Sequence, residues 1–181
     1  MSRVVGAHQY QRPFDTESPF YALVDLENTE IETETVFEVY SKCVDEKLIT
    51  DGVISQSIDQ ARALWRLRED ISETLWHFQP YKNDISVRIS KMADFLSDVS
   101  QLIQKNYPDF EIIWYGHIGD GNIHLNILKP KNLSTLQFKS FCDGVSMSLG
   151  ELISKYEGSI SAEHGVGSVS YTHLTLPTIV R

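Results

Sequence analysis

Apolar residues recur every three or four positions over several parts of the chain, which is the spacing of one face of a helix. The clearest case lies between residues 57 and 80, where Ser57 or Asp59 can cap a helix and Pro80 can stop it. Its apolar positions are Leu64, Leu67, Ile71, Leu75 and Phe78. This pattern predicts one long amphipathic helix. Further helices are predicted at about 33–48, 90–106 and 134–156.

Shorter stretches that alternate in polarity separate these helices and predict strands. The strands are predicted at 20–27, 53–56, 84–88, 110–117, 122–128 and 158–162. Helices and strands alternate irregularly and include one hairpin, so the order predicts an α+β fold in which helices pack on an antiparallel sheet. Residues 1–18 lack a sustained period and predict an irregular lead-in, which leaves one domain over residues 19–167.

The dipeptide Asp120-Gly121 lies between the two strands of this hairpin. A two-residue type I′ turn favours such a pair, because both central residues need a positive φ. A turn at these residues places His117 directly opposite His124, with Cβ atoms about 4.5 to 5.5 Å apart. Two imidazole nitrogens at this separation can share one divalent cation, since each metal–nitrogen bond is about 2.0 to 2.1 Å long.

The same register separates polar from apolar positions along the hairpin. It places Tyr115 opposite Asn126 on the histidine face, so that polar side chains line one side of the sheet. The other side carries apolar residues, which are Trp114, Ile118, Ile123, Leu125 and Ile127. One interpretation is a binding site on the polar side, and the other is a pair of solvated histidines on a half-exposed hairpin.

Residues 161–167, Ser-Ala-Glu-His-Gly-Val-Gly, offer further chemistry. Glu163 supplies a carboxylate as a third ligand, and a site with two histidines and one carboxylate suits zinc, iron or manganese. His164 can act as an acid or base near neutral pH if a turn at Gly165 brings it back toward the site.

Three more residues are candidates for holding a carboxylate group. Arg68 and Ser72 lie four positions apart beside the apolar stripe of the predicted long helix, and Lys82 follows just after Pro80. Arg presents a planar pair of donors and Lys a point charge, so the three can bind an anionic substrate. A solvated helix face explains Arg68 and its neighbours equally well, and the pattern alone favours that interpretation.

The charge balance excludes some classes of partner. The 181 residues carry 16 Lys and Arg against 25 Asp and Glu, and the formal net charge of −9 argues against nucleic acid or an anionic membrane. No apolar stretch approaches the ~20 residues of a membrane span and no signal peptide opens the chain, so we expect a cytoplasmic location. Cys43 and Cys142 form neither a disulfide framework nor a Cys-based zinc motif, and we expect two buried thiols.

Four motifs together resemble a known family. They are Leu64-Trp-Arg-Leu-Arg-Glu69, Asp84-Ile-Ser-Val87, Gly116-His-Ile-Gly-Asp-Gly-Asn-Ile-His-Leu-Asn126 and Ser159-Ile-Ser-Ala-Glu-His-Gly-Val-Gly167. Residues 10–167 resemble the C-terminal, substrate-binding domain of the FAD-linked oxidases, flavoenzymes that oxidise D-2-hydroxyglutarate, D-lactate or glycolate. The resemblance implies that FAD is held mainly by a separate N-terminal domain, and that this chain alone is inactive.

The resemblance also implies roles for the candidate residues. His117, His124 and Glu163 match the ligands of a divalent metal, usually zinc, and His164 matches the base that takes the hydroxyl proton as hydride leaves C2 for the flavin. The residues that match substrate-binding positions are Arg68, Ser72, Lys82 and Asn126. The resemblance leaves the 2-hydroxy acid, the electron acceptor and the oligomeric state open.

The chain departs from the family in places. Arg88 stands where Pro is common, and Ser72 stands where some members have Thr. Residues 169–178 resemble the translation of a sequencing adapter, so we interpret 169–181 as an artefact and expect the natural sequence to continue differently after Gly167.

Two hypotheses from other functional classes also explain these residues. The same three ligands can activate water in a metal-dependent hydrolase without a flavin, and they can equally bind a metal in a domain that has no catalytic role.

Overall fold

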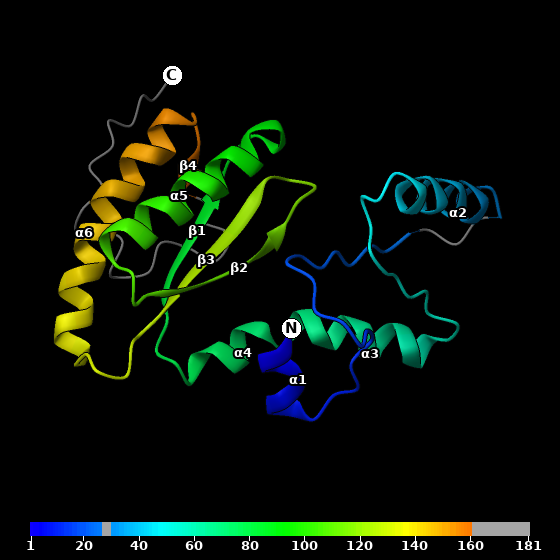
Figure 1. The fold of residues 1–181 in the computed structure, drawn as a ribbon, viewed down its shortest axis with the longest axis horizontal. Helices are drawn as coiled ribbons and strands as arrows, with labels where there is room; N and C mark the ends of the chain where they lie inside the picture. The colour runs from blue at the N-terminus through cyan, green and yellow to red at the C-terminus, as the bar shows by residue number, and fades with distance from the viewer. Residues whose placement is uncertain (27–29, 161–181) are drawn as a thin grey trace, which may run out of the picture. The chain divides into compact units, whose positions relative to one another are not determined.

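A computed structural model describes residues 1–26 and 30–160 of the chain (Figure 1). The chain divides into two compact units, Met1–His77 and Phe78–Arg181, and each is described by itself. All strands of the described chain lie in the second unit, which therefore carries the sheet and its hairpin.

The described part of the first unit contains helices and no strand. The helices are α1 (Ser2–His8), α2 (Glu30–Asp45), α3 (Ile58–Glu69) and α4 (Ile71–Trp76). The strands predicted at 20–27 and 53–56 are wrong, because residues 20–26 and 53–56 are irregular. Alternating polarity yields a strand only where a neighbouring strand completes the backbone hydrogen bonds. The apolar positions of the first segment are also not buried, since Phe20 is 77% exposed.

The predicted long helix at 57–80 is two helices that meet at Asp70. Ser57 caps α3 as predicted, since its hydroxyl accepts a hydrogen bond from the Gln60 backbone N–H at 3.3 Å. Asp70 has a ψ of 4°, far from the helical value of about −42°, and its carboxylate accepts a 2.5 Å hydrogen bond from the Tyr10 hydroxyl. The break between α3 and α4 therefore lies at a residue that Tyr10 contacts, and the local helical pattern cannot predict this contact.

The second unit mixes helices and strands in the predicted order. Its elements are β1 (Tyr81–Ser86), the 3₁₀ helix η1 (Ile89–Lys91), α5 (Met92–Asn106), β2 (Glu111–His117), β3 (Asn122–Leu128), α6 (Thr135–Lys155) and β4 (Ser159–Ile160). The strands form one sheet in the order β2-β3-β1-β4, and every neighbouring pair is antiparallel. The α+β prediction is confirmed.

A capping box marks the start of one of the two long helices. Ser134 and Gln137 form a capping box, in which each side chain pairs with the other residue's backbone N–H, so α6 begins where the sequence predicts. Ser90 instead lies inside η1, and α5 begins two residues later at Met92. The predicted start of this helix at residue 90 is therefore two residues too early.

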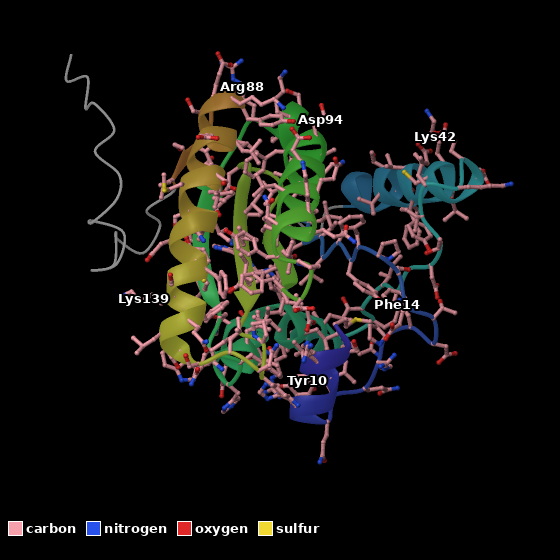
Figure 2. The ribbon with its side chains drawn as sticks, turned by 60° about the vertical axis from the view of Figure 1, so that its left-hand side comes forward. Tyr10, Phe14, Lys42, Arg88, Asp94 and Lys139 are labelled. Atoms are coloured by element: carbon pink, nitrogen blue, oxygen red, sulfur yellow. The ribbon has the colours of Figure 1, made fainter. Side chains whose placement is uncertain are left out.

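Helices α5 and α6 lie side by side against one face of the sheet (Figure 2). The core between them consists of buried apolar side chains, which are Ile85, Val87, Phe95, Val99, Ile103, Ile123, Leu125, Ile127, Phe138, Val145, Leu149 and Ile153. Cys142 is buried in the same core, and burial raises the pKa of its thiol to about 12, which keeps the thiol protonated and unreactive. Cys43, also expected to be buried, is only half-buried.

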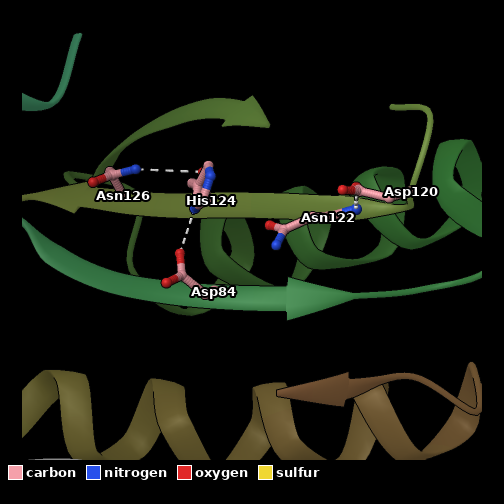
Figure 3. Close-up of polar contacts among 5 residues, drawn as sticks. All are labelled: Asp84, Asp120, Asn122, His124 and Asn126. Atoms are coloured by element: carbon pink, nitrogen blue, oxygen red, sulfur yellow. Dashed lines mark hydrogen bonds and ion pairs between the residues drawn. The ribbon is translucent and has the colours of Figure 1, made fainter. Parts of the chain in front are cut away.

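The β2–β3 hairpin closes through the four residues 118–121 rather than through the predicted two-residue turn. Gly121 has a positive φ of 76°, but Asp120 does not adopt a positive φ. The Asp120 carboxylate instead accepts a 2.9 Å hydrogen bond from the Asn122 backbone N–H (Figure 3), an arrangement typical of Asp in turns. Ile118 is 72% exposed in this loop, so its predicted place on the apolar face is wrong.

The longer loop shifts the pairing of the two strands by two residues. His117 lies opposite Asn122, and His124 lies opposite Tyr115, so the predicted direct pairing of the two histidines is wrong. Because side chains alternate with a period of two, a shift by an even number keeps each strand residue on its predicted face. Both histidines therefore still lie on the same side of the sheet.

Gly121→Ala is expected to lower the free energy of unfolding of the second unit by about 2 to 4 kcal/mol. A Cβ on this left-handed residue would lie 2.1 Å from the backbone oxygen of Val87, so the loop and the end of β1 would have to separate. Gly119→Ala is the matched control, since nothing lies within 4 Å of its Cβ, and it should change the value by less than about 0.5 kcal/mol. Urea unfolding compares the two, and equal losses would contradict this loop geometry.

Candidate functional site

Polar side chains from three strands share the face of the sheet opposite α5 and α6. The register places them together, because directly paired residues in antiparallel strands lie on the same face. They are Lys82, Asp84 and Ser86 on β1, Tyr115 and His117 on β2, and Asn122, His124 and Asn126 on β3. We call these eight residues the polar face. Four predicted site residues belong to it: Lys82, His117, His124 and Asn126.

His124 lies at the centre of the polar face and is held from both neighbouring strands. Its Nδ1 contacts Oδ1 of Asp84, its direct partner on β1 (Figure 3). On the β2 side, the rings of His124 and Tyr115 have centroids 4.8 Å apart and planes inclined by 38°. The residue is only 9% exposed. These contacts restrict the ring to one orientation, and a metal ion would then bind Nε2.

The rings of His117 and His124 approach each other although the two residues are diagonal rather than directly opposed. Their centroids lie 5.9 Å apart and their planes are inclined by 79°. A metal 2.0 to 2.1 Å from a ring nitrogen lies about 3.2 Å from that ring's centroid, so two rings that bind one tetrahedral ion have centroids about 5.2 Å apart. The observed separation is somewhat wider than this value, and the two rings lie close to the geometry of a shared ion.

Asn126 is fully buried on the same strand, two residues beyond His124. Its Nδ2 donates a 3.3 Å hydrogen bond to the His124 backbone oxygen, whereas its buried Oδ1 accepts no hydrogen bond from any residue that the structure describes. A buried oxygen without a donor is costly, so this atom is suited to accept a hydrogen bond from a bound ligand. Lys82 is the direct partner of Asn126 on β1 and is exposed.

The other predicted site residues lie elsewhere. Arg68 is in the last turn of α3 and Ser72 is in the first turn of α4, so both belong to the first unit. Glu163 and His164 lie outside the described residues, as do residues 169–181. Within 1–26 and 30–160, no three His, Cys, Asp or Glu side chains gather as a metal site. The described chain thus contains two of the three predicted metal ligands.

Sequence reasoning missed the roles of Asp84 and Tyr115 beside His124. The sequence predicts a strand that begins at Asp84, and it predicts Tyr115 opposite Asn126. The alternation within β1 could have put Asp84 on the same face as Lys82, but its pairing with His124 depends on β1 lying next to β3. That neighbour relation joins segments about 40 residues apart and leaves no local signal.

Comparison with known proteins places this chain in a family. Residues 1–175 match the family model described as FAD linked oxidases, C-terminal domain. The chain belongs to this family.

Relatives named D-2-hydroxyglutarate dehydrogenase cover most of this FAD-linked oxidase domain. A protein of Stutzerimonas stutzeri is 47% identical over 175 residues, which are 96% of this chain and 38% of the relative. One of Xanthomonas citri pv. viticola is 44% identical over 171 residues, or 94% of this chain and 36% of the relative. A mitochondrial one of Danio rerio is 35% identical over 156 residues, which are 84% of this chain and 28% of the relative. The chain therefore spans less than two fifths of each of these relatives.

Arg88, where the resemblance to the FAD-linked oxidases implies proline, has backbone angles that proline can also adopt. Its φ is −56° and its ψ is 135°, and proline adopts such a φ. The guanidinium pairs with Glu157 at 3.5 Å, and both side chains are 69% exposed, so this ion pair contributes little. The departure therefore changes the surface and leaves the strand before it intact. Among the helices of the described chain, none has the length and hydropathy of a membrane span.

Proposed function

We propose that this domain binds the substrate in a FAD-dependent dehydrogenase that oxidises a D-2-hydroxy acid to a 2-oxo acid. The observation that carries the proposal is the polar face, where two histidine rings 5.9 Å apart lie beside the buried Asn126, whose Oδ1 has no donor among residues 1–26 and 30–160. The names of the relatives support D-2-hydroxyglutarate as the first substrate to test. We also propose a cytoplasmic location, on the sequence grounds given above.

We propose His117, His124 and Glu163 as ligands of a divalent metal, with zinc as the first candidate. The spacing of the two rings supports a shared ion, and the carboxylate of Asp84 behind His124 is a common partner of metal-binding histidines. Two histidines and one carboxylate leave a position open for a substrate oxygen. When bound, the metal supplies a Lewis acid and FAD supplies the hydride acceptor.

The residues of the chain bind the substrate and move one proton. Asn126 Oδ1 accepts a hydrogen bond from the substrate, and Lys82 pairs with a substrate carboxylate. His164 takes the hydroxyl proton while the hydride leaves C2, so the 2-oxo acid has lost one proton and one hydride. Arg68 and Ser72 are proposed as further carboxylate contacts on the resemblance alone.

The test uses the complete reading frame that encodes this chain, expressed and loaded with FAD and zinc. We expect reduction of an artificial dye with D-2-hydroxyglutarate, and no reduction with L-2-hydroxyglutarate, because the groups that hold the substrate place the single C2 hydrogen of only one enantiomer toward the flavin. D-Lactate and glycolate are tested beside it. Chelation should remove activity and zinc should restore it.

Each result decides between the functional classes. Absence of turnover with every 2-hydroxy acid, in protein that holds flavin and metal, would reject the dehydrogenase. Hydrolysis of ester or amide substrates by protein that contains metal and no flavin would favour the metal-dependent hydrolase. Bound metal without either activity would favour the noncatalytic domain.

A further inference from the structure

Asp84 is a residue of the polar face to which the proposed reaction gives no contact with the substrate or the metal. Its carboxylate oxygen contacts His124 Nδ1, and the two residues are direct partners in the β1–β3 pairing. Asp84 is half-buried, which favours a defined contact over a solvated carboxylate. We propose that Asp84 is a positioning residue that holds the His124 ring in the Nδ1–H tautomer and thereby presents Nε2 to the metal. The inference rests on the metal site in the proposed function.

The chemistry of the two groups determines the tautomer. An ionised carboxylate has acceptors and no donor, so the ring nitrogen that it contacts must carry the hydrogen. In a neutral imidazole the other nitrogen, Nε2, then has the lone pair that a metal requires. The carboxylate also makes that nitrogen a stronger ligand, because it stabilises the partial positive charge that the ring acquires on binding.

The strands supply the rigidity that such a role needs. His124 is on the central pair of strands, with Asp84 on one side and the Tyr115 ring on the other. Backbone pairing on both sides prevents the residue from moving toward either neighbour. Without Asp84, the ring could exchange tautomers or turn about its Cβ–Cγ bond, and each alternative would cost metal affinity.

A purely structural ion pair is the competing explanation, and two substitutions separate them. Asp84→Asn keeps an oxygen that can accept from Nδ1–H, whereas Asp84→Ala removes the acceptor. A structural pair predicts that both change only stability. A positioning role predicts that the alanine variant weakens zinc binding about 10- to 100-fold, and that the asparagine variant restores part of the loss.

Asp98→Asn provides a matched control. Asp98 also has a defined partner set, since its carboxylate accepts hydrogen bonds from Lys155 Nζ at 2.7 Å and the Tyr156 hydroxyl at 2.8 Å, which together lower the pKa of Asp98. It lies on α5, on the helix side of the sheet. The control should therefore bind zinc like the unsubstituted protein, although it also loses a charged partner.

The experiment measures two quantities in the complete protein. Competition with a chromophoric chelator gives the zinc affinity of each variant, and ¹⁵N chemical shifts of the histidine rings, recorded without metal, give the tautomer of His124. We expect Nδ1–H in the unsubstituted protein and in Asp84→Asn, and a mixture of tautomers in Asp84→Ala.

The outcomes distinguish this inference from the proposed function. If the unsubstituted protein binds zinc and the alanine variant binds it equally well, with His124 unchanged, then only the role of Asp84 is wrong. If the unsubstituted protein binds no zinc, the metal site and the role built on it are both wrong. If Asp84→Ala does not fold, Asp84→Asn tests the proposal instead. Zinc affinity equal to that of Asp98→Asn, combined with a mixture of His124 tautomers, would overturn the proposal.

Discussion

Leu149→Ala is expected to lower the free energy of unfolding of the second unit by about 2 to 5 kcal/mol. Leu149 is 2% exposed and packs in the core between α6 and the sheet. Truncation removes apolar contacts and leaves a cavity that the surrounding strands and helices fill only in part. A loss of this size is a large share of the stability of a small domain.

The measurement can be confined to the second unit. The chain has three tryptophans, and Trp65 and Trp76 lie in the first unit, so Trp65→Phe and Trp76→Phe leave Trp114 as the only tryptophan reporter. Trp114 packs against the core, and urea unfolding should change its fluorescence.

Leu136→Ala makes the same chemical change in the same helix at an exposed position. Leu136 is 82% exposed, and its substitution should change the free energy by less than about 0.5 kcal/mol. Comparable losses at the two positions would show that α6 does not face the sheet through Leu149.

The elements of the second unit were predictable because local signals agree there. β3 alternates polar and apolar residues from Asn122 to Ile127, and Ser134 with Gln137 marks the start of α6. Side-chain alternation also placed His117, His124 and Asn126 on one face correctly. This part of the candidate site depends only on the two-residue period of a strand, so the error of two residues in the predicted register does not change it.

The register itself depends on contacts that are distant in sequence. Asp120-Gly121 fits a two-residue turn, but the Asp120 side chain caps the Asn122 N–H, and the Gly121 oxygen accepts a 3.1 Å hydrogen bond from the Val87 N–H. Val87 follows β1, so the loop geometry belongs to three strands rather than two. The Asp84–His124 contact has the same origin, and so does the bend at Asp70, which coincides with a contact from Tyr10.

His124→Ala is expected to lower kcat/KM of the FAD- and zinc-loaded complete protein about 10²- to 10⁴-fold. A bound metal contributes several kcal/mol to transition-state stabilisation, and each 1.36 kcal/mol corresponds to a factor of ten. His124 is the more constrained of the two histidines, because Asp84 and Tyr115 fix its ring whereas His117 is exposed at the end of β2. Its loss should therefore remove zinc as well as activity.

Zinc content and kcat/KM are measured together on each variant, and tryptophan fluorescence confirms that the protein is folded. His77→Ala is the control, since His77 is an exposed histidine at the end of α4 that belongs to no proposed site. It should keep both zinc and activity. If His124→Ala retains zinc and turnover at the level of His77→Ala, then His124 is not a ligand of a catalytic metal. Loss of turnover with full zinc content would instead assign His124 a contact with the substrate, and the metal would have to lie elsewhere.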